Sequence, residues 1–298
     1  MLCLTCLLSL LLAGGMWQAV PAAETVLYER RSPYSLVTVT EDERGLRTLM
    51  FDRNGVRQSV VKPGDPDHIE LPYAKAALAA LAFVERPERI LVIGLGGGTI
   101  PSFLHKHYPS ATIDAVDIDP DVVRVAREFF GFREDARMHA HVEDGRRFVE
   151  KCRQPYDLIF LDAFGAEEIP YHLVTRQFLT AVRRVVSPGG VVVANIWDRS
   201  ANPLYDSMVR TYQAVFDDLY VLSVPAVGNR ILFALPTRRH VAIEELARRA
   251  RAISTRRRFR FDLGEFIRDG LRRESVPDPR GSVLLDRPAP TTASASPG

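Results

Sequence analysis

The fold is decided by the stretch Arg89-Ile-Leu-Val-Ile-Gly-Leu-Gly-Gly-Gly-Thr-Ile-Pro101, in which an apolar run passes directly into glycines and a helix start. Residues 90–93 are expected to form a buried strand, and residues 103–104 begin an apolar helical face. Glycines without a Cβ permit both a tight turn and the close approach of a ligand to helix N–H groups. Those expected to do so are Gly94, Gly96 and Gly98. The stretch predicts the start of a βαβ unit with a ligand at its turn.

The residues after these glycines indicate which ligand is expected. Thr99 stands where a dinucleotide fingerprint has its third glycine. The next expected strand, residues 112–117, ends in Asp117, whose carboxylate can bind ribose hydroxyls. The pattern therefore predicts a nucleoside without a pyrophosphate, and the structural alternative is a simple tight turn.

Length and composition allow one large domain or two modest ones. The chain has 298 residues, of which 46% are hydrophobic, enough for a sizeable core. The formal net charge of +2 excludes no class of function. After residue 23, Cys152 is the only cysteine, which excludes a disulfide framework and a thiolate metal site.

Residues 1–23 are expected to be a signal peptide. They are apolar, contain no charged side chain, and end in small residues around Ala22 and Ala23 that are typical of signal-peptidase cleavage. The protein is therefore predicted to be periplasmic or secreted. A single uncleaved membrane anchor is the alternative, because a run of this length also fits such a segment.

Residues 24–62 are expected to form a small antiparallel β-sheet before the main domain. Apolar and polar side chains tend to alternate, and Asn54-Gly55 is a favourable hairpin turn. Pro63–Pro66 closes this sheet, and helical spacing follows from Ile69 to Phe83.

Residues 63–237 alternate between expected strands and helices. Further strands are expected at 138–142, 156–161, 191–196, 220–224 and 230–235, and helices at 119–130, 173–186 and 203–216. A turn is expected at Ser187-Pro-Gly-Gly190. Such alternation predicts an α/β fold with a mostly parallel, doubly wound sheet.

Three acids follow strands of this sheet: Asp117, Asp144 and Asp162. The carboxyl ends of parallel strands meet at one edge, where ligands bind in open α/β sheets. Each acid has the alternative role of capping the next helix. Asp162 is the hardest to explain as a cap, because it lies between an apolar run and Ala-Phe-Gly165. We expect it to be partly buried with a raised pKa, as a general base or cation-binding group would be.

The chain resembles the spermidine synthase family of polyamine aminopropyltransferases, built on a Rossmann-like domain of the class I methyltransferase type. The similar motifs are the glycine loop Gly94–Gly98, the ribose-binding segment Val116–Pro120 and the adenine-contacting segment Glu143–Gly145. The resemblance extends from about Tyr34 to Leu235, and Val283–Asp286 is similar to a short C-terminal stretch of the family. The family also has a small N-terminal β-sheet.

The resemblance implies a reaction. Asp162 would deprotonate the attacking amine, while Asp117 and Asp144 would bind the donor, decarboxylated S-adenosylmethionine. Tyr73, Thr99 and Glu167 are the positions expected at the substrate. The partner would be a small-molecule amine or polyamine, and the protein would be a homodimer.

The chain departs from the family pattern at four positions. Thr99 and Gly165 replace two acids, Ser35 replaces a glutamine, and Ala74 replaces a histidine. Each ammonium removed from water needs a carboxylate or several acceptors, so ordinary putrescine aminopropylation is not expected. Glu167 and Glu168 are candidates to substitute for the missing acids, and solvated loop acids are the alternative.

Two classes of function remain open. The first is a transferase that uses either decarboxylated S-adenosylmethionine with an amine acceptor or S-adenosylmethionine as a methyl donor. Attack on a carbon beside S⁺ requires alignment and a base but no metal. The second is a non-catalytic periplasmic protein that binds a nucleoside or polyamine. No nucleic-acid partner is expected.

The C-terminal part differs in composition. Residues 238–276 are rich in arginine, with an apolar helical stripe at Leu246, Ala250 and Ile253. A solvated helix face is expected, with contact to anionic lipid or nucleic acid as the alternative. Residues 277–298, rich in Pro, Ser and Thr, are expected to be largely disordered.

The histidines and two aromatic residues also have alternatives. His105 and His107 are expected at the surface, whereas His139 and His141 share one face of a strand, where a metal pair is the alternative. The aromatic residues Trp197 and Tyr205 are expected either beside an acceptor pocket or in the core.

Overall fold

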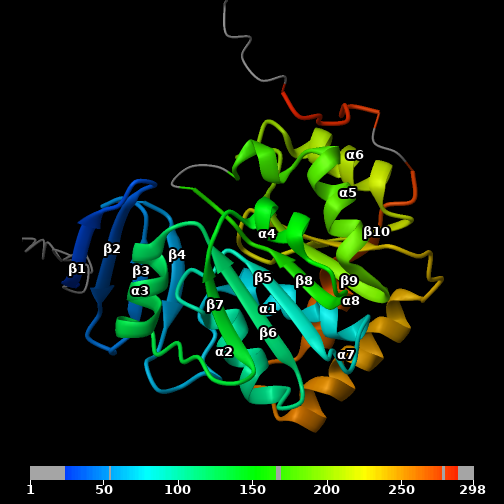
Figure 1. Cartoon of the computed structure of the whole chain (residues 1–298). Helices are drawn as coiled ribbons and strands as arrows, with labels where there is room; N and C mark the ends of the chain where they lie inside the picture. The colour runs from blue at the N-terminus through cyan, green and yellow to red at the C-terminus, as the bar shows by residue number, and fades with distance from the viewer. Residues whose placement is uncertain (1–23, 54, 166–168, 277–278, 288–298) are drawn as a thin grey trace, which may run out of the picture.

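The computed structural model describes residues 24–53, 55–165, 169–276 and 279–287. These residues form a small antiparallel sheet and a large mixed sheet with helices on both of its faces (Figure 1). The predicted α/β architecture with a preceding β-sheet is therefore confirmed. The expected leader, residues 1–23, lies outside the described residues, and the domain limits remain predictions. Within the described part of the chain, no helix combines the length and apolarity needed to cross a bilayer.

The small sheet contains four strands that pair in chain order, all antiparallel. They are β1 (Thr25–Arg31), β2 (Leu36–Glu41), β3 (Arg47–Met50) and β4 (Arg57–Val61). Val37, Val39 and Leu49 pack against Val122 and Val125 of helix α3 (Pro120–Phe129). This apolar contact fixes the small sheet beside the large one (Figure 1). Asn54 of the expected hairpin turn lies outside the described residues.

The large sheet has the strand order β12-β10-β11-β9-β8-β5-β6-β7. Its parallel strands are β5 (Arg89–Ile93), β6 (Thr112–Asp117), β7 (Met138–Val142), β8 (Tyr156–Leu161) and β9 (Val186–Trp197). Its antiparallel strands are β10 (Asp218–Ser223), β11 (Asn229–Leu235) and β12 (Leu271–Arg273). From β5 the chain runs outward to β6 and β7 and then returns to β8 on the other side. The sheet therefore has a switch point between β5 and β8, where ligands bind in such folds.

Successive residues of β5 belong to apolar layers on opposite faces of the sheet, as expected for a strand covered on both faces. The helices besides α3 are α1 (Pro72–Ala77), η1 (Leu78–Ala82), α2 (Thr99–His107), α4 (Gly145–Lys151), η2 (Tyr171–Leu173), α5 (Arg176–Val185), α6 (Tyr205–Val215), α7 (Ile243–Arg257) and α8 (Leu263–Gly270). Ile90 and Val92 join the layer formed by α1, η1, α2, α7 and α8, whereas Leu91 and Ile93 join the layer formed by α4, α5 and α6. The two layers hold the strand ends of the sheet in fixed positions.

Three expected boundaries are wrong. The helix expected at 69–83 begins at Pro72, which suits a first helical turn, and passes into the 3₁₀ helix η1. Residues 187–190 belong to β9, and the extra residues produce a shift in its register with β8. The helix expected from 173 begins at Arg176, because the side chain of Thr175 caps it.

The C-terminal part packs on the main domain. The stripe Leu246, Ala250 and Ile253 is buried, and the outward arginines of α7 form ion pairs such as Arg251–Asp262 and Arg256–Glu85. These contacts favour the solvated face that was expected.

The segment 279–287 contradicts the expectation of a largely disordered tail. The side chain of Leu284 is buried in the core, and Asp286 forms a two-pronged ion pair with Arg146. Residues 277–278 and 288–298 lie outside the described residues.

Candidate functional site

A cavity of about 410 Å³ opens at the carboxyl edge of β5, β6 and β8, between the large and small sheets. Its lining includes four of the residues predicted for a nucleoside, Gly94, Gly96, Asp117 and Asp144, together with the predicted base Asp162. The fold thus brings together side chains that are up to about seventy positions apart, because parallel strands end at one edge.

The glycine loop is shaped by close backbone contacts. Gly94 has φ +96°, and a Cβ there would lie 2.3 Å from the carbonyl oxygen of Asp162. Gly96 has φ +53°, and its Cβ would lie 2.7 Å from Oγ of Ser59. The same Ser59 hydroxyl accepts a hydrogen bond from the N–H of Gly97 at 2.9 Å, which ties the loop to β4. Gly98 is the N-terminal cap residue of α2 and does not line this cavity.

Asp117 is held by backbone amides. Its oxygens accept hydrogen bonds from the N–H groups of Leu95 and Asp119, each at 3.0 Å. Burial raises the pKa of Asp117 to about 6, although these hydrogen bonds oppose the shift. Each carboxylate oxygen has a further lone pair, so the group can still accept hydrogen bonds from ligand hydroxyls.

Asp144 both caps helix α4 and lines the cavity. Its Oδ1 accepts from the N–H of Arg147 at 3.0 Å and caps α4, while Oδ2 lies 2.8 Å from Nε2 of His172. Although burial raises the pKa of Asp144, the hydrogen bonds from Arg147 and His172 outweigh it and lower the pKa. His172 could not be predicted from local sequence, because its partner Asp144 belongs to another element.

Asp162 lies at the switch point of the sheet. Its backbone N–H binds the carbonyl of Ile93 at 2.8 Å, and no helix follows it in the described residues 163–165 and 169–170. Burial raises the pKa of the Asp162 carboxyl to about 7, while hydrogen bonds from Asn195 and Tyr73 lower it. The expected partial burial and raised pKa are therefore confirmed, and a helix cap does not explain this acid.

Two buried amides support Asp162. Asn195 on β9 donates from Nδ2 to Oδ1 of Asp162 at 2.9 Å, and its own Oδ1 accepts from Nδ2 of Asn229 on β11, also at 2.9 Å. Neither asparagine was predicted from the sequence, because their contact depends on the register of antiparallel strands.

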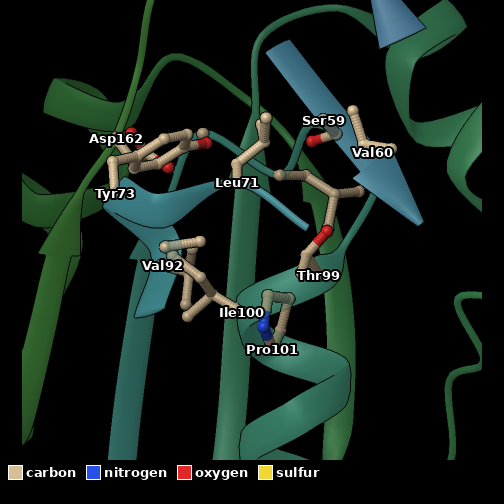
Figure 2. Close-up of a pocket in the computed structure, with 12 residues that line it drawn as sticks. Ser59, Val60, Leu71, Tyr73, Val92, Thr99, Ile100, Pro101 and Asp162 are labelled. Atoms are coloured by element: carbon tan, nitrogen blue, oxygen red, sulfur yellow. The ribbon is translucent and has the colours of Figure 1, made fainter. Parts of the chain in front are cut away.

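Tyr73 and Thr99 line a void of about 20 Å³ that shares Ser59, Tyr73 and Asp162 with the cavity (Figure 2). The side chains of Tyr73 and Asp162 lie next to each other there, and the Tyr73 hydroxyl also donates to the carbonyl of Gln58 at 3.2 Å. Thr99 opens α2 on the other side of the void. The third predicted substrate residue, Glu167, lies outside the described residues, so its role remains a prediction.

A second cavity, of about 300 Å³, adjoins the first. The two share Gln58, Tyr73, Phe164 and Gly165. Trp197 lines the second cavity, as one of its two expected placements predicted. Tyr205 instead is buried under the guanidinium of Arg199, with 4.6 Å to the ring centre.

Several histidines are paired with carboxylates. His107 lies 2.7 Å from Asp67 and is largely buried, so its expected surface position is wrong. His141 pairs with Asp114 at 2.8 Å. Among the residues that the structure describes, no three His, Cys, Asp or Glu side chains are grouped to hold a metal ion.

Comparison with known proteins identifies the family. Residues 75–236 match the family described as "Spermine/spermidine synthase domain". The chain belongs to this family. It is 39% identical over 220 residues to the polyamine aminopropyltransferase of Vibrio vulnificus, and the match covers 72% of this chain and 73% of that protein.

Solved structures similar to this chain include the following two. Human methyltransferase-like protein 13 in complex with SAH is 34% identical, with a TM-score of 0.59, and the match covers 63% of this chain and 93% of that one. A probable spermidine synthase from Corynebacterium glutamicum has a TM-score of 0.69 at 23% identity, covering 88% of this chain and 97% of that one. The methyltransferase-like fold expected from the sequence is thus confirmed.

Proposed function

We propose that the protein is a transferase that binds a sulfonium nucleoside and transfers its aminopropyl group to an amine acceptor, with Asp162 as general base. The position of Asp162 supports this most directly. It lies at the edge of a nucleoside-sized cavity, and the second cavity begins at its neighbours Tyr73 and Phe164.

The first cavity is suited to the donor. Asp117 would accept hydrogen bonds from the ribose hydroxyls, and the adenine would lie towards Asp144 and Ile118. The sulfonium would then lie near Gly94 and Asp162. The SAH complex of the human relative supports an S-adenosylmethionine-derived donor.

The proposed reaction is a single nucleophilic displacement at the carbon bonded to the sulfonium sulfur. The lone pair of the acceptor nitrogen forms a C–N bond, the C–S⁺ bond breaks, and sulfur leaves as a neutral thioether. The proton released from nitrogen passes to the carboxylate of Asp162. A carboxyl whose pKa is about 7 is partly ionised near neutral pH, and it is a stronger base than an ordinary aspartate. Removal of the amine from water lowers its pKa as well, which assists this transfer.

Methyl transfer from S-adenosylmethionine is the second candidate. An aminopropyl donor carries an ammonium that needs a carboxylate when it leaves water. Among the described residues around the void at Thr99, Asp162 is the one carboxylate. The proposed mechanism of aminopropyl transfer uses that group as the base, so these residues offer no second carboxylate for the ammonium of the donor. The likeness to the human methyltransferase also supports this candidate. A non-catalytic binding protein is the remaining alternative.

We further propose, from the sequence, that residues 1–23 export the protein or anchor it in a membrane and, from the resemblance to the family, that it acts as a homodimer. Both proposals are independent of the site chemistry.

Product analysis tests the function. The protein is incubated with each donor and a mixture of primary amines, and the nucleoside product is identified chromatographically. Aminopropyl transfer releases 5′-methylthioadenosine, whereas methyl transfer releases S-adenosylhomocysteine. Asp162→Asn should lower turnover by about 10²–10⁴-fold and leave affinity for the nucleoside product nearly unchanged. Tight nucleoside binding without turnover of either donor would exclude both transferase functions and leave the alternative of a non-catalytic binding protein.

A further inference from the structure

Residues 281–287 form a strap that is bonded to helices α5 and α6. The N–H of Leu284 donates to Oγ1 of Thr211 on α6 at 2.9 Å. The carbonyl of Leu284 accepts from the N–H of Arg176, the first residue of α5, at 2.8 Å. These bonds and the burial of the Leu284 side chain give the strap a fixed course over the two helices.

The carboxylate of Asp286 joins the strap to the starts of α4 and α5. Its two oxygens accept hydrogen bonds from both Nη atoms of Arg146, at 2.8 and 2.7 Å, and Oδ1 also accepts from Oγ1 of Thr175 at 2.7 Å. Arg146 is the second residue of α4, and Thr175 caps α5. A two-pronged pair with arginine fixes geometry as well as charge, so Asp286 holds the two helix starts in register with the strap.

Tyr171 joins the strap to η2. Its hydroxyl donates to the carbonyl of Leu285 at 3.1 Å, and the guanidinium of Arg287 lies over its ring, 4.3 Å from the centre. The next residue, His172, lines the first cavity. The strap therefore contacts η2 directly beside a residue of the candidate nucleoside site.

These contacts form a closed ring beside the first cavity. Nε2 of His172 lies 2.8 Å from Oδ2 of Asp144, and both residues line the cavity. Asp144 caps α4, which carries Arg146 and so leads to Asp286. From Asp286 the strap returns to η2 through Tyr171. Asp286 and Arg146 are outside the lining of the cavity, so any effect of theirs on a ligand there is transmitted by the residues of this ring.

We propose that Asp286 is a positioning residue for nucleoside binding, because it holds α4 and η2 at the separation at which His172 contacts Asp144. The inference rests on the proposed function, which assigns the first cavity to the nucleoside and places the adenine towards Asp144. A wall that is ordered before the ligand arrives does not have to be ordered during binding, so its loss weakens affinity.

Calorimetry with 5′-methylthioadenosine tests the inference on the full-length protein. Asp286→Asn keeps the shape of the side chain and removes its charge, so the dissociation constant should rise about three- to tenfold. Glu29→Gln is the matched control, because Glu29 forms a two-pronged pair with Arg53, at 3.0 and 2.6 Å, and lines neither cavity. It should bind as tightly as the parent. Equal affinity of Asp286→Asn and the parent, or an equal loss in Glu29→Gln, would overturn the inference.

A double-mutant cycle separates positioning from a general loss of stability. In the background of His172→Ala, Asp286→Asn should change the affinity by less than about twofold, because the contact that it positions is already absent. Additive losses would overturn the inference. In turnover assays the loss in Asp286→Asn should appear in KM for the donor, and a lower kcat at unchanged KM would contradict the positioning role.

Tyr171→Phe tests the other attachment of the strap. It removes the bond to the carbonyl of Leu285 and keeps the ring, so a smaller loss of affinity in the same direction is expected. If Asp286→Asn does not fold, Tyr171→Phe takes its place with the same two outcomes. Absence of nucleoside binding by the parent would overturn both this inference and the proposed function. Binding without turnover of either donor would overturn only the proposed function.

Discussion

Asn195 donates a hydrogen bond to the carboxylate of Asp162 and accepts one from Asn229, which links three neighbouring strands of the mixed sheet. The side chains are largely withdrawn from solvent, with 6% of Asn195 and 5% of Asn229 exposed. An amide that donates to a carboxylate favours its ionised form and fixes its orientation. Asn195 is therefore a positioning residue for the proposed base.

Loss of this amide should change the pH profile of turnover. In Asn195→Leu the carboxylate loses the donor that lowers its pKa. The ascending limb of the plot of kcat/KM against pH should therefore move to higher pH by roughly one unit. Asn229→Leu keeps the direct donor and should produce a smaller shift in the same direction. A lower rate with an unmoved limb in Asn195→Leu would contradict the positioning role.

Asp162→Asn should stabilise the protein at alkaline pH. The pKa of Asp162 is about 7 in the folded protein and 3.8 in its unperturbed state. Its contribution to stability is therefore complete at pH values below the pKa of the unfolded state. That contribution is lost as the pH rises through the pKa of the folded state. Asparagine does not titrate, so Tm should exceed that of the parent at about pH 8 and equal it near about pH 4. The comparison is made by differential scanning calorimetry.

Asp157→Ala, on the strand β8 that ends just before Asp162, is the control for that experiment. Asp157 accepts hydrogen bonds from the backbone N–H groups of Glu88 and Arg89, at 2.9 and 3.1 Å. Its removal should lower Tm at both pH values, because these two backbone donors and the hydroxyl of Ser187 lose their acceptor. A lower Tm of Asp162→Asn at alkaline pH would show that the carboxylate is stabilising and that burial does not govern its pKa.

Asp117→Ala should weaken nucleoside binding. A hydrogen bond to a charged group contributes about 1.5–3 kcal/mol, so affinity for 5′-methylthioadenosine should fall at least roughly tenfold. Asp114→Ala, on the same strand, is the matched control, because Asp114 pairs with His141 and Tyr156 away from the cavity. Equal affinity of Asp117→Ala and the parent in calorimetry would refute the ribose assignment.

Gly94→Ala should damage both stability and activity. The added methyl group would lie 2.3 Å from the carbonyl oxygen of Asp162, at a backbone angle that alanine rarely adopts. A cost of about 1–3 kcal/mol in unfolding free energy is expected, together with loss of turnover as the base is displaced. Gly189→Ala, whose Cβ would have nothing within 4 Å, should leave both unchanged. Urea denaturation and initial rates measure the two effects.

The leader gives a prediction about location. Expressed with residues 1–23 in a bacterium, the protein should be found in the periplasmic or membrane fraction, and the cleaved form should begin at Ala23 or Glu24. N-terminal sequencing of the fractions measures this. Recovery of intact protein from the cytoplasm would remove the argument for export.

Much of the fold and part of the site followed from local sequence. The run Ile90–Ile93 into glycines, and the acids at the ends of β6, β7 and β8, sufficed to predict a βαβ sheet with Asp117, Asp144 and Asp162 at one edge. Such inferences succeed because side-chain periodicity and strand direction are local properties, and parallel strands must end together. Boundaries such as the start of α5 were missed because a single cap residue sets them.

The glycine turn, the alternation of elements and the acids at the strand ends could therefore be predicted from the amino-acid sequence, since each depends on residues near one another in the chain. The three-dimensional structure was needed to show that Asn195 and Asn229 support Asp162, that His172 pairs with Asp144, and that a second cavity adjoins the first. These contacts join strands and loops that are distant in sequence. Their partners are selected by strand register and by packing between layers, and no local pattern records either of them.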